Sequence, residues 1–238
     1  MGKGIVYYTH NCLEEPIFSA VQKKLLEAEL PITSISLKPI DFGDNIVLLR
    51  EPGIITMTEQ ILAGLEAMRE DVVFFAEHDV LYHKSHFDFT PTEDIFYYNT
   101  NVWRWDYPFD RLITYDHLKS LSGLCARREL LVGHYRKRVE LIREKGWEDT
   151  SREPLWSRKI GHEPGKNRSI LSEKSEEWKS EYPNIDIRHK GTITRRKCRL
   201  ADFIHEPTNW KEATIEDIPG WKLAYLFPVV QRCSLSTP

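Results

Sequence analysis

Two carboxylates, Glu77 and Asp79, directly follow the apolar run 72–76. Residues two apart in an extended segment point to the same side, so these carboxylates can share a divalent cation and the phosphates that it carries. A short run rich in β-branched and aromatic residues predicts a strand buried on both faces of a mostly parallel sheet. Ligands bind just outside the carboxyl ends of such strands. The alternative interpretation is a solvated acidic turn.

Histidines near these carboxylates raise the question of zinc. His78, His83 and His86 lie close together in the sequence, but they lack a recognised zinc-ligand spacing. The other interpretation is that they are loop histidines at a substrate cleft. A further histidine, His189, ends the alternating segment 184–189, which predicts another strand.

The elements before the carboxylates predict a β-α-β-loop-α-β order. Strand-like segments cover 4–8 and 31–37, and an acidic, proline-containing start predicts a helix between them over 14–28. This order favours a right-handed crossover and a parallel pair of strands. The Thr56 and Glu59 spacing fits a capping box and predicts a helix over 56–69 that leads into the apolar strand.

The second part of the chain combines aromatic and basic segments. The segment 102–109 is rich in aromatic residues, which can form an ordinary sheet or a platform on which sugar rings or bases stack. A helix is predicted over 128–145, with a basic face that is expected to be solvated. The basic run 190–197 follows His189 and fits either phosphate binding or a nucleic-acid patch.

Glu163 is a candidate for a general base. It lies in a Pro-Gly turn context, which can hold a side chain rigidly at a site. A base must come within hydrogen-bond distance of the hydroxyl that it activates. The alternative is a surface carboxylate in a turn.

The ordered features resemble the GT-A fold of nucleotide-sugar glycosyltransferases, in particular the family-2-like group. The resemblance rests on the polar turn 8–11, the helix 56–69 and Glu77-His78-Asp79, an E-H-D variant of the D-x-D motif. It implies a single GT-A-like (Rossmann-like) α/β domain, with a central, mostly parallel sheet flanked by helices. Residues 1–125 would form its nucleotide-sugar-binding half, and 126–238 its acceptor-binding and C-terminal half.

The resemblance also implies roles for individual residues in a metal-dependent transfer from a nucleotide-diphosphate sugar, expected to be UDP-linked, to an acceptor hydroxyl. The expected donor-binding residues are Thr9, His10, Asn11, Gln60, Glu77, His78, Arg195 and Arg196. Mn²⁺ or Mg²⁺ would be held by Asp79 with Glu77 and His189. Arg195 and Arg196 would neutralise the departing diphosphate. Asp149, in the segment 147–150, lies about where the resembled family has an E-D motif with a general base, or it is a surface carboxylate in a turn. Glu163, the preferred candidate, or Asp149 would activate the acceptor.

Two other function classes remain open. A metal-dependent nucleotidyltransferase would normally have a Gly-rich, basic loop after the first strand, and the segment 9–12 is neither. A non-catalytic binding module would use the acidic motif only as structure. The acceptor is a saccharide, a protein side chain or a hydroxylated base in DNA. The sequence does not determine whether the anomeric configuration of the sugar is retained or inverted.

Composition limits the remaining classes. The 238 residues suffice for one large domain, and the net charge of −3 disfavours a protein built to wrap nucleic acid. The 4 cysteines form no C-x-x-C pair, which favours reduced thiols. No apolar run approaches the roughly 20 residues of a membrane span, and no secretory signal is evident, so a cytoplasmic location is expected. P-loop, G-x-S-x-G and G-x-G-x-x-G motifs do not occur.

Overall fold

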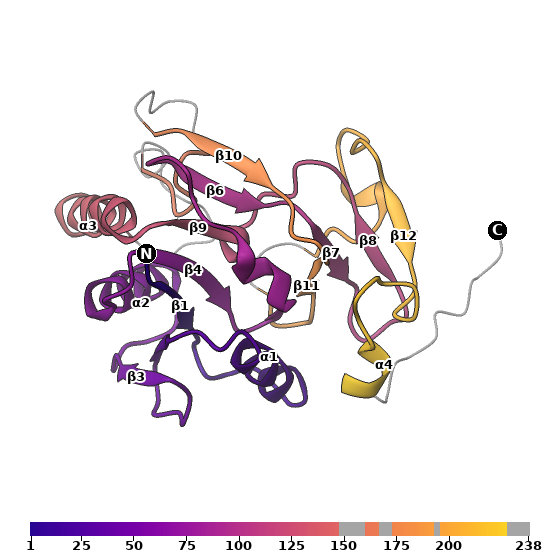
Figure 1. Ribbon diagram of the computed structural model, residues 1–238, viewed down its shortest axis with the longest axis horizontal. Helices are drawn as coiled ribbons and strands as arrows, with labels where there is room; N and C mark the ends of the chain where they lie inside the picture. Colours follow the sequence, from indigo (N-terminus) through magenta and orange to yellow (C-terminus); the bar gives the residue numbers. More distant parts are fainter. Residues whose placement is uncertain (148–159, 167–172, 193–195, 228–238) are drawn as a thin grey trace.

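The computed structural model describes residues 1–147, 160–166, 173–192 and 196–227. Two sheets organise this part of the chain (Figure 1). The larger sheet has seven strands in the order β10-β6-β9-β4-β1-β2-β3. Its strands, in chain order, are β1 (Lys3–Tyr8), β2 (Ile32–Ser36), β3 (Asp44–Val47), β4 (Val72–Glu77), β6 (Phe96–Asn99), β9 (Leu124–Arg127) and β10 (Ser175–Trp178).

The larger sheet is mostly parallel. Strands β3, β2, β1 and β4 pair in parallel, β10 pairs with β6 in parallel, and β9 runs antiparallel to both β4 and β6. The ends of β1 and β4 are in register, with Tyr8 opposite Glu77. The predicted α/β fold, with a central, mostly parallel sheet, is therefore confirmed. Residues that follow β1 and β4 leave the sheet at the same edge.

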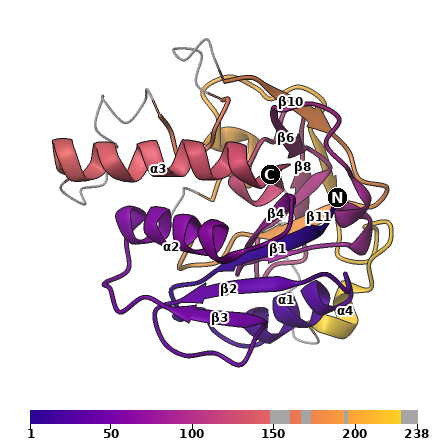
Figure 2. The ribbon, with the colours of Figure 1, turned by 60° about the vertical axis from the view of Figure 1, so that its left-hand side comes forward.

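Strand β4 is buried on both faces, as its composition predicts. Phe74 and Phe75 are both fully buried and face opposite sides, where each joins a different hydrophobic cluster. Full burial of such a side chain contributes about 1.5–3 kcal/mol relative to exposure. Helix α1 (Ile17–Leu26) packs on the side of Phe74, and helices α2 (Ile54–Ala67) and α3 (Arg128–Lys145) on the side of Phe75. Figure 2 shows α2 and α3 side by side on that face.

A smaller sheet of five strands continues from the carboxyl edge of β4, in the order β12-β8-β7-β11-β5. In this sheet, β11 pairs in parallel with β7 and antiparallel with the edge strand β5, which follows Asp79. The amide of Ile187, at the end of β11, donates to the Asp79 carbonyl over 2.9 Å. The strands are β5 (Val80–Leu81), β7 (Val102–Trp105), β8 (Leu112–Thr114), β11 (Asn184–Ile187) and β12 (Lys211–Ala213).

The start of α2 differs from the prediction. The helix begins at Ile54 after Gly53, and no side chain caps it, so the predicted capping box is wrong. Thr56 lies inside the first turn, where its hydroxyl donates to the Glu51 carbonyl over 2.6 Å. Remaining short elements are the helix α4 (Leu223–Leu226) and the 3-10 helices η1 (Lys84–Asp88), η2 (Leu121–Gly123) and η4 (Leu200–Asp202).

The cysteines among the described residues are reduced. Cys12, Cys125 and Cys198 carry free thiols. Burial raises the pKa of Cys198 to about 11, so this thiol stays protonated at neutral pH.

In the described part of the chain, helices are either too short or too polar to cross a lipid bilayer.

Candidate functional site

Three distant segments bring polar side chains together at the carboxyl edge of β1 and β4. His10 follows β1, His78 and Asp79 follow β4, and His189 follows β11. The rings of His10 and His78 have centroids 4.7 Å apart, and Nε2 of His189 lies 3.5 Å from Oδ2 of Asp79. We call these four residues the Asp79 cluster. The side chains of Asp79 and His189 are each 14% exposed.

Asp79 is the ionised group of this cluster. Burial alone would raise the pKa of its carboxyl, but contact with His189, the neighbouring His78 side chain and the charge of Arg188 hold the pKa below its ordinary value. Asp79 is therefore a carboxylate at neutral pH. Burial lowers the pKa of His78 to about 4, and it also lowers the pKa of His10. Both imidazoles are therefore neutral at pH 7 and can bind a proton donor or a cation.

Two ring nitrogens of the Asp79 cluster are buried and have no hydrogen-bond partner in the described part of the chain. They are Nδ1 of His78 and Nε2 of His189. The 3.5 Å from His189 Nε2 to the Asp79 carboxylate is too long for a good hydrogen bond. Buried polar atoms are normally paired, so the unpaired nitrogens indicate a place for a bound group.

Glu77 behaves differently from Asp79. Its carboxyl accepts a hydrogen bond from the Tyr8 hydroxyl over 2.9 Å, and its amide donates to the Tyr82 hydroxyl over 2.9 Å. Burial, with the charge of Asp79 second, raises the pKa of Glu77 to about 8. Glu77 is therefore mostly protonated at neutral pH. Because Asp79 lies in the turn before β5 and not in an extended segment, the alternation that would place the two carboxylates on one side does not hold.

Of the three predicted metal ligands, the structure brings only two close together. Asp79 and His189 meet, whereas Glu77 is held against Tyr8. Within the described ranges, no three or more His, Cys, Asp and Glu side chains lie close enough to hold a metal ion. His83 and His86 are committed elsewhere: His83 Nδ1 lies 2.9 Å from Ser85 Oγ, and His86 Nδ1 contacts the amide nitrogens of Asn99 and Asn184.

Thr9 and Asn11 shape the turn that carries His10. The Thr9 hydroxyl accepts from the Asn11 amide over 3.1 Å, and Asn11 adopts a left-handed conformation, with φ of 61°. Oδ1 of Asn11 accepts from the amides of Leu37 and Lys38 over 2.7 and 3.0 Å. The side chains of Thr9 and Asn11 thus accept hydrogen bonds from backbone amides of the protein itself. The structure therefore supports a role for both residues in positioning His10.

Gln60 also acts on this turn. It is 3% exposed on α2, and its Nε2 donates to the carbonyls of Thr9 and Ile35 over 2.8 and 3.2 Å. The amide group thus ties α2 to the ends of β1 and β2. The Nε2 group of Gln60 already donates to these two backbone carbonyls. Gln60 therefore supports the turn that carries His10.

Glu163 lies on a segment that α3 and β6 hold in place. The hydroxyls of Tyr98 and Tyr135 donate to the carbonyls of Pro164 and His162, each over 2.6 Å. His134 Nε2 lies 2.8 Å from the Gly161 carbonyl. The Glu163 carboxylate pairs with Lys166 over 2.6 Å. Its charge also contributes to the raised pKa of Glu77, after burial and the charge of Asp79.

Arg196 is paired in the structure. Its Nη2 donates to Asp106 over 2.6 Å and to the Tyr107 carbonyl over 2.7 Å. Asp106 also pairs with Arg111 over 2.7 Å. The candidates Asp149 and Arg195 lie outside the described residues.

Arg104 and Arg188 were not identified from the sequence. Both flank Asp186 on the smaller sheet, at 3.4 and 3.3 Å, and the Arg188 charge helps to keep Asp79 ionised. Arg104 also donates to the Tyr115 hydroxyl over 2.7 Å. The alternation of Asp186 and Arg188 along the segment 184–189 was visible in the sequence. The pairing of β11 with β7, which adds Arg104, was not.

Comparisons with known proteins give only distant similarities. No family model and no curated protein matches the chain. Among solved structures, a glycosyltransferase involved in the glycosylation of the major capsid of PBCV-1 aligns with a TM-score of 0.45 and 8% identity, over 75% of this chain and 82% of that chain. The apo-form glycosyltransferase GlyE of Streptococcus pneumoniae TIGR4 aligns with a TM-score of 0.40 and 12% identity, over 63% and 40%. Similarity at this level does not identify a family.

Proposed function

We propose that this chain is a glycosyltransferase, which moves a sugar from a nucleotide-diphosphate donor, in the first instance a UDP-sugar, to an acceptor hydroxyl. The observation that carries the proposal is the meeting of ionised Asp79 and His189 at the carboxyl edge of the parallel strands. This edge is where open α/β sheets bind ligands. The sequence order that resembles GT-A enzymes supports the same assignment.

Asp79 and His189 are the proposed protein ligands of Mn²⁺ or Mg²⁺. Their facing atoms are 3.5 Å apart, near the separation of about 3.0–3.4 Å between two ligands of one ion with bonds of about 2.1 Å. The unpaired Nε2 of His189 and the low pKa of Asp79 fit a cation between them. When bound, a divalent cation supplies positive charge that stabilises a diphosphate leaving group.

The proposed role of Glu77 is indirect. As a carboxyl protonated at neutral pH, it is suited to donate a hydrogen bond to a water molecule or a donor oxygen. Asp79, two residues later, supplies the negative charge. A pair of carboxyls with pKa values driven apart is a pattern that enzymes use to divide roles within one site.

Glu163 is the proposed base on the acceptor side, with Asp149 as the second candidate. Glu163 belongs to the segment 160–166, which hydrogen bonds from Tyr98 and Tyr135 hold in place. To act as a base, its carboxylate would have to leave Lys166 and accept from the acceptor hydroxyl.

Arg195 and Arg196 are proposed to neutralise the diphosphate. For this, Arg196 would have to leave Asp106 and bind phosphate oxygens. The proposed acceptor is a saccharide or another hydroxyl-bearing polymer, and the net charge of −3 disfavours DNA.

The first test removes the Asp79 charge. With Mn²⁺ and a panel of UDP-sugars, we expect Asp79→Asn to reduce UDP release by about 100-fold or more, because the charge that holds the cation is lost. EDTA should have the same effect on the unaltered protein. The control is Asp94→Asn: Asp94 is 75% exposed and precedes β6, at the opposite edge of the sheet. Full turnover in Asp79→Asn, or in EDTA, would overturn the proposal.

The second test compares Glu77→Gln with Asp79→Asn in the same assay. Glutamine keeps a neutral side chain of the same length, so it can still accept from Tyr8. We expect turnover to fall by less than about tenfold at pH 7, since the replaced group is already mostly protonated. A loss as large as that of Asp79→Asn would show that a charged Glu77 is required.

A further inference from the structure

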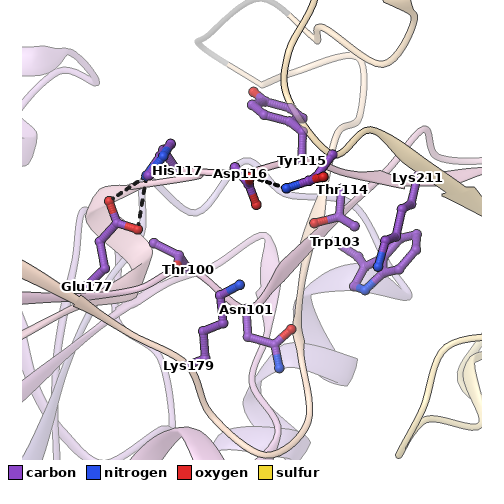
Figure 3. Close-up of a pocket in the computed structure, with 11 residues that line it drawn as sticks. Thr100, Asn101, Trp103, Thr114, Tyr115, Asp116, His117, Glu177, Lys179 and Lys211 are labelled. Atoms are coloured by element: carbon purple, nitrogen blue, oxygen red, sulfur yellow. Dashed lines mark hydrogen bonds and ion pairs between the residues drawn. The ribbon is translucent and has the colours of Figure 1, made fainter.

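A polar pocket lies outside the Asp79 cluster. It has a volume of about 580 Å³ and shares no residue with that cluster. We call it the Trp103 pocket (Figure 3). Its walls come from the turn between β6 and β7, from β7 itself, from the end of β8 and from the end of β10. Lys211 of β12 completes it.

The walls of the Trp103 pocket are already fixed by internal contacts. On one side, His117 Nδ1 lies 3.0 Å from Oε1 of Glu177, and Lys119 also pairs with Glu177 over 3.4 Å. At the end of β8, Asp116 accepts from Asn209 through Oδ2. Figure 3 shows His117 and Glu177 on the opposite side of the pocket from Trp103 and Lys211.

Several polar atoms in the pocket remain available for a ligand. In the ranges that the structure describes, Nε1 of Trp103, the ammonium groups of Lys179 and Lys211, and Oδ1 of Asp116 have no hydrogen-bond partner. The indole of Trp103 adds a partly exposed aromatic surface. The pocket thus presents donors and an acceptor around the indole of Trp103.

This combination matches the surface of a sugar. A pyranose ring has an apolar face of C–H groups and a rim of hydroxyls that both donate and accept hydrogen bonds. Aromatic rings bury such an apolar face, while convergent polar groups fix the orientation of the ligand. A simple anion would use the lysines but would leave the Trp103 surface and the Asp116 carboxylate without a favourable contact. A purely apolar ligand would leave all the polar atoms unpaired.

We propose that the Trp103 pocket binds a pyranose unit of a saccharide, with the ring on Trp103 and its hydroxyls on Asp116, Lys179 and Lys211. The proposal stands apart from the proposed transfer reaction, because binding at this pocket needs neither the donor nor a metal ion. If the transfer proposal also holds, a glycan seated here is held by the protein at a second point.

The test is isothermal titration of the full chain, without nucleotide or metal, against hexasaccharides of glucose (β1,4 and β1,3), N-acetylglucosamine and galacturonate. We expect at least one to bind, and Trp103→Ala and Asp116→Asn each to weaken that binding by about tenfold or more. Lys211→Ala is a third variant, because Lys211 is exposed and its loss leaves the core intact. Tyr225→Ala is the control, since this aromatic side chain is 86% exposed and lies outside the pocket.

Circular dichroism confirms that each variant is folded before titration. Asp79→Asn distinguishes the two sites: saccharide binding equal to that of the unaltered chain supports a separate pocket. Loss of binding in Asp79→Asn with retention in Trp103→Ala and Asp116→Asn would place the saccharide at the Asp79 cluster and overturn the proposal. Absence of binding by every hexasaccharide at millimolar concentration would overturn it too.

Discussion

Glu77 and Asp79 are separated by one residue, yet one is mostly protonated at neutral pH and the other is ionised. The cause is the direction in which each side chain leaves the strand end. Glu77 ends β4 and is buried there, and burial with the charge of Asp79 raises its pKa despite the hydrogen bond from Tyr8. Asp79 turns towards histidines and Arg188, which lower its pKa. Environment, more than residue type, decides the charge of a carboxyl group at this site.

His86 is a second residue whose charge is set by its surroundings. Its Nδ1 lies 2.9 Å from Nδ2 of Asn99 and 3.1 Å from Nδ2 of Asn184. An amide nitrogen only donates, so Nδ1 must be an acceptor and the ring must be neutral. Burial lowers the pKa of His86 to about 3. Protonation would break both contacts, which join β6 of one sheet to β11 of the other.

This pKa predicts a pH dependence of stability. Below about pH 6.5 the unfolded chain binds a proton at this histidine, while the folded chain does not until about pH 3. The free energy of unfolding should therefore fall as the pH falls across this window, by about 1.4 kcal/mol per pH unit from His86 alone. Urea unfolding of His86→Gln should show a slope against pH that is smaller by this amount. His205→Gln, at an exposed histidine, is the control, and an unchanged slope in His86→Gln would contradict the prediction.

Helix α2 connects the site to the sheet and depends on a close approach at Gly64. A methyl group at Gly64 would collide with Ile35 of β2 and Val6 of β1, both of which are buried. The same helix carries Gln60, which supports the turn of His10. The seating of α2 on β1 and β2 is therefore a requirement of the site as well as of the core.

Gly64→Ala is predicted to destabilise the protein by about 1–3 kcal/mol, because overpacking forces neighbouring side chains or the backbone to move. Gly133→Ala is the matched control: Gly133 lies on α3, and a methyl group there would have nothing within 4 Å. This change should stabilise the protein by about 0.5–1 kcal/mol, since alanine is the better helix former. Urea unfolding midpoints measure both. Equal midpoints for the two variants would disprove the close approach.

Sequence patterns predicted elements better than their pairing. The burial of β4 was predictable from its composition, and the parallel β1 and β2 pair from the crossover between them. The insertion of antiparallel β9 between β4 and β6 was not, because pairing across many residues leaves no local pattern. The capping-box prediction failed because Thr56 and Glu59 have the right spacing but lie within a helix that Gly53 precedes.

The same limit applies to the site. The polar residues after β1, β4 and β11 were predictable, because each ends a recognisable strand. Their electrostatics were not, because the raised pKa of Glu77 depends on burial and on the charge of Asp79, against which the hydrogen bond from Tyr8 across the sheet acts. The role of Arg104 depends on β7 lying beside β11, which only the three-dimensional structure gives.

For the whole molecule, the proposed function predicts ligand-linked stability. A ligand that binds only the folded chain stabilises it by about 2.7 kcal/mol at 100 times its Kd. We expect UDP with Mn²⁺ to raise the Tm, and Asp79→Asn to abolish the shift while Asp94→Asn retains it. Differential scanning calorimetry measures the three proteins under the same conditions. Stabilisation by a nucleoside triphosphate without metal, and none by UDP with Mn²⁺, would instead favour a nucleotidyltransferase.

The position of β11 between β5 and β7 has a consequence for biosynthesis. Both neighbours leave the ribosome early, whereas β11 follows β7 by about 80 residues, which takes roughly 4–16 s at 5–20 residues per second. Until then β5 and β7 present unpaired edges, which are prone to associate with other chains. His189 arrives with the same strand, so the nascent polypeptide acquires its protection from aggregation and its Asp79 cluster in a single late step.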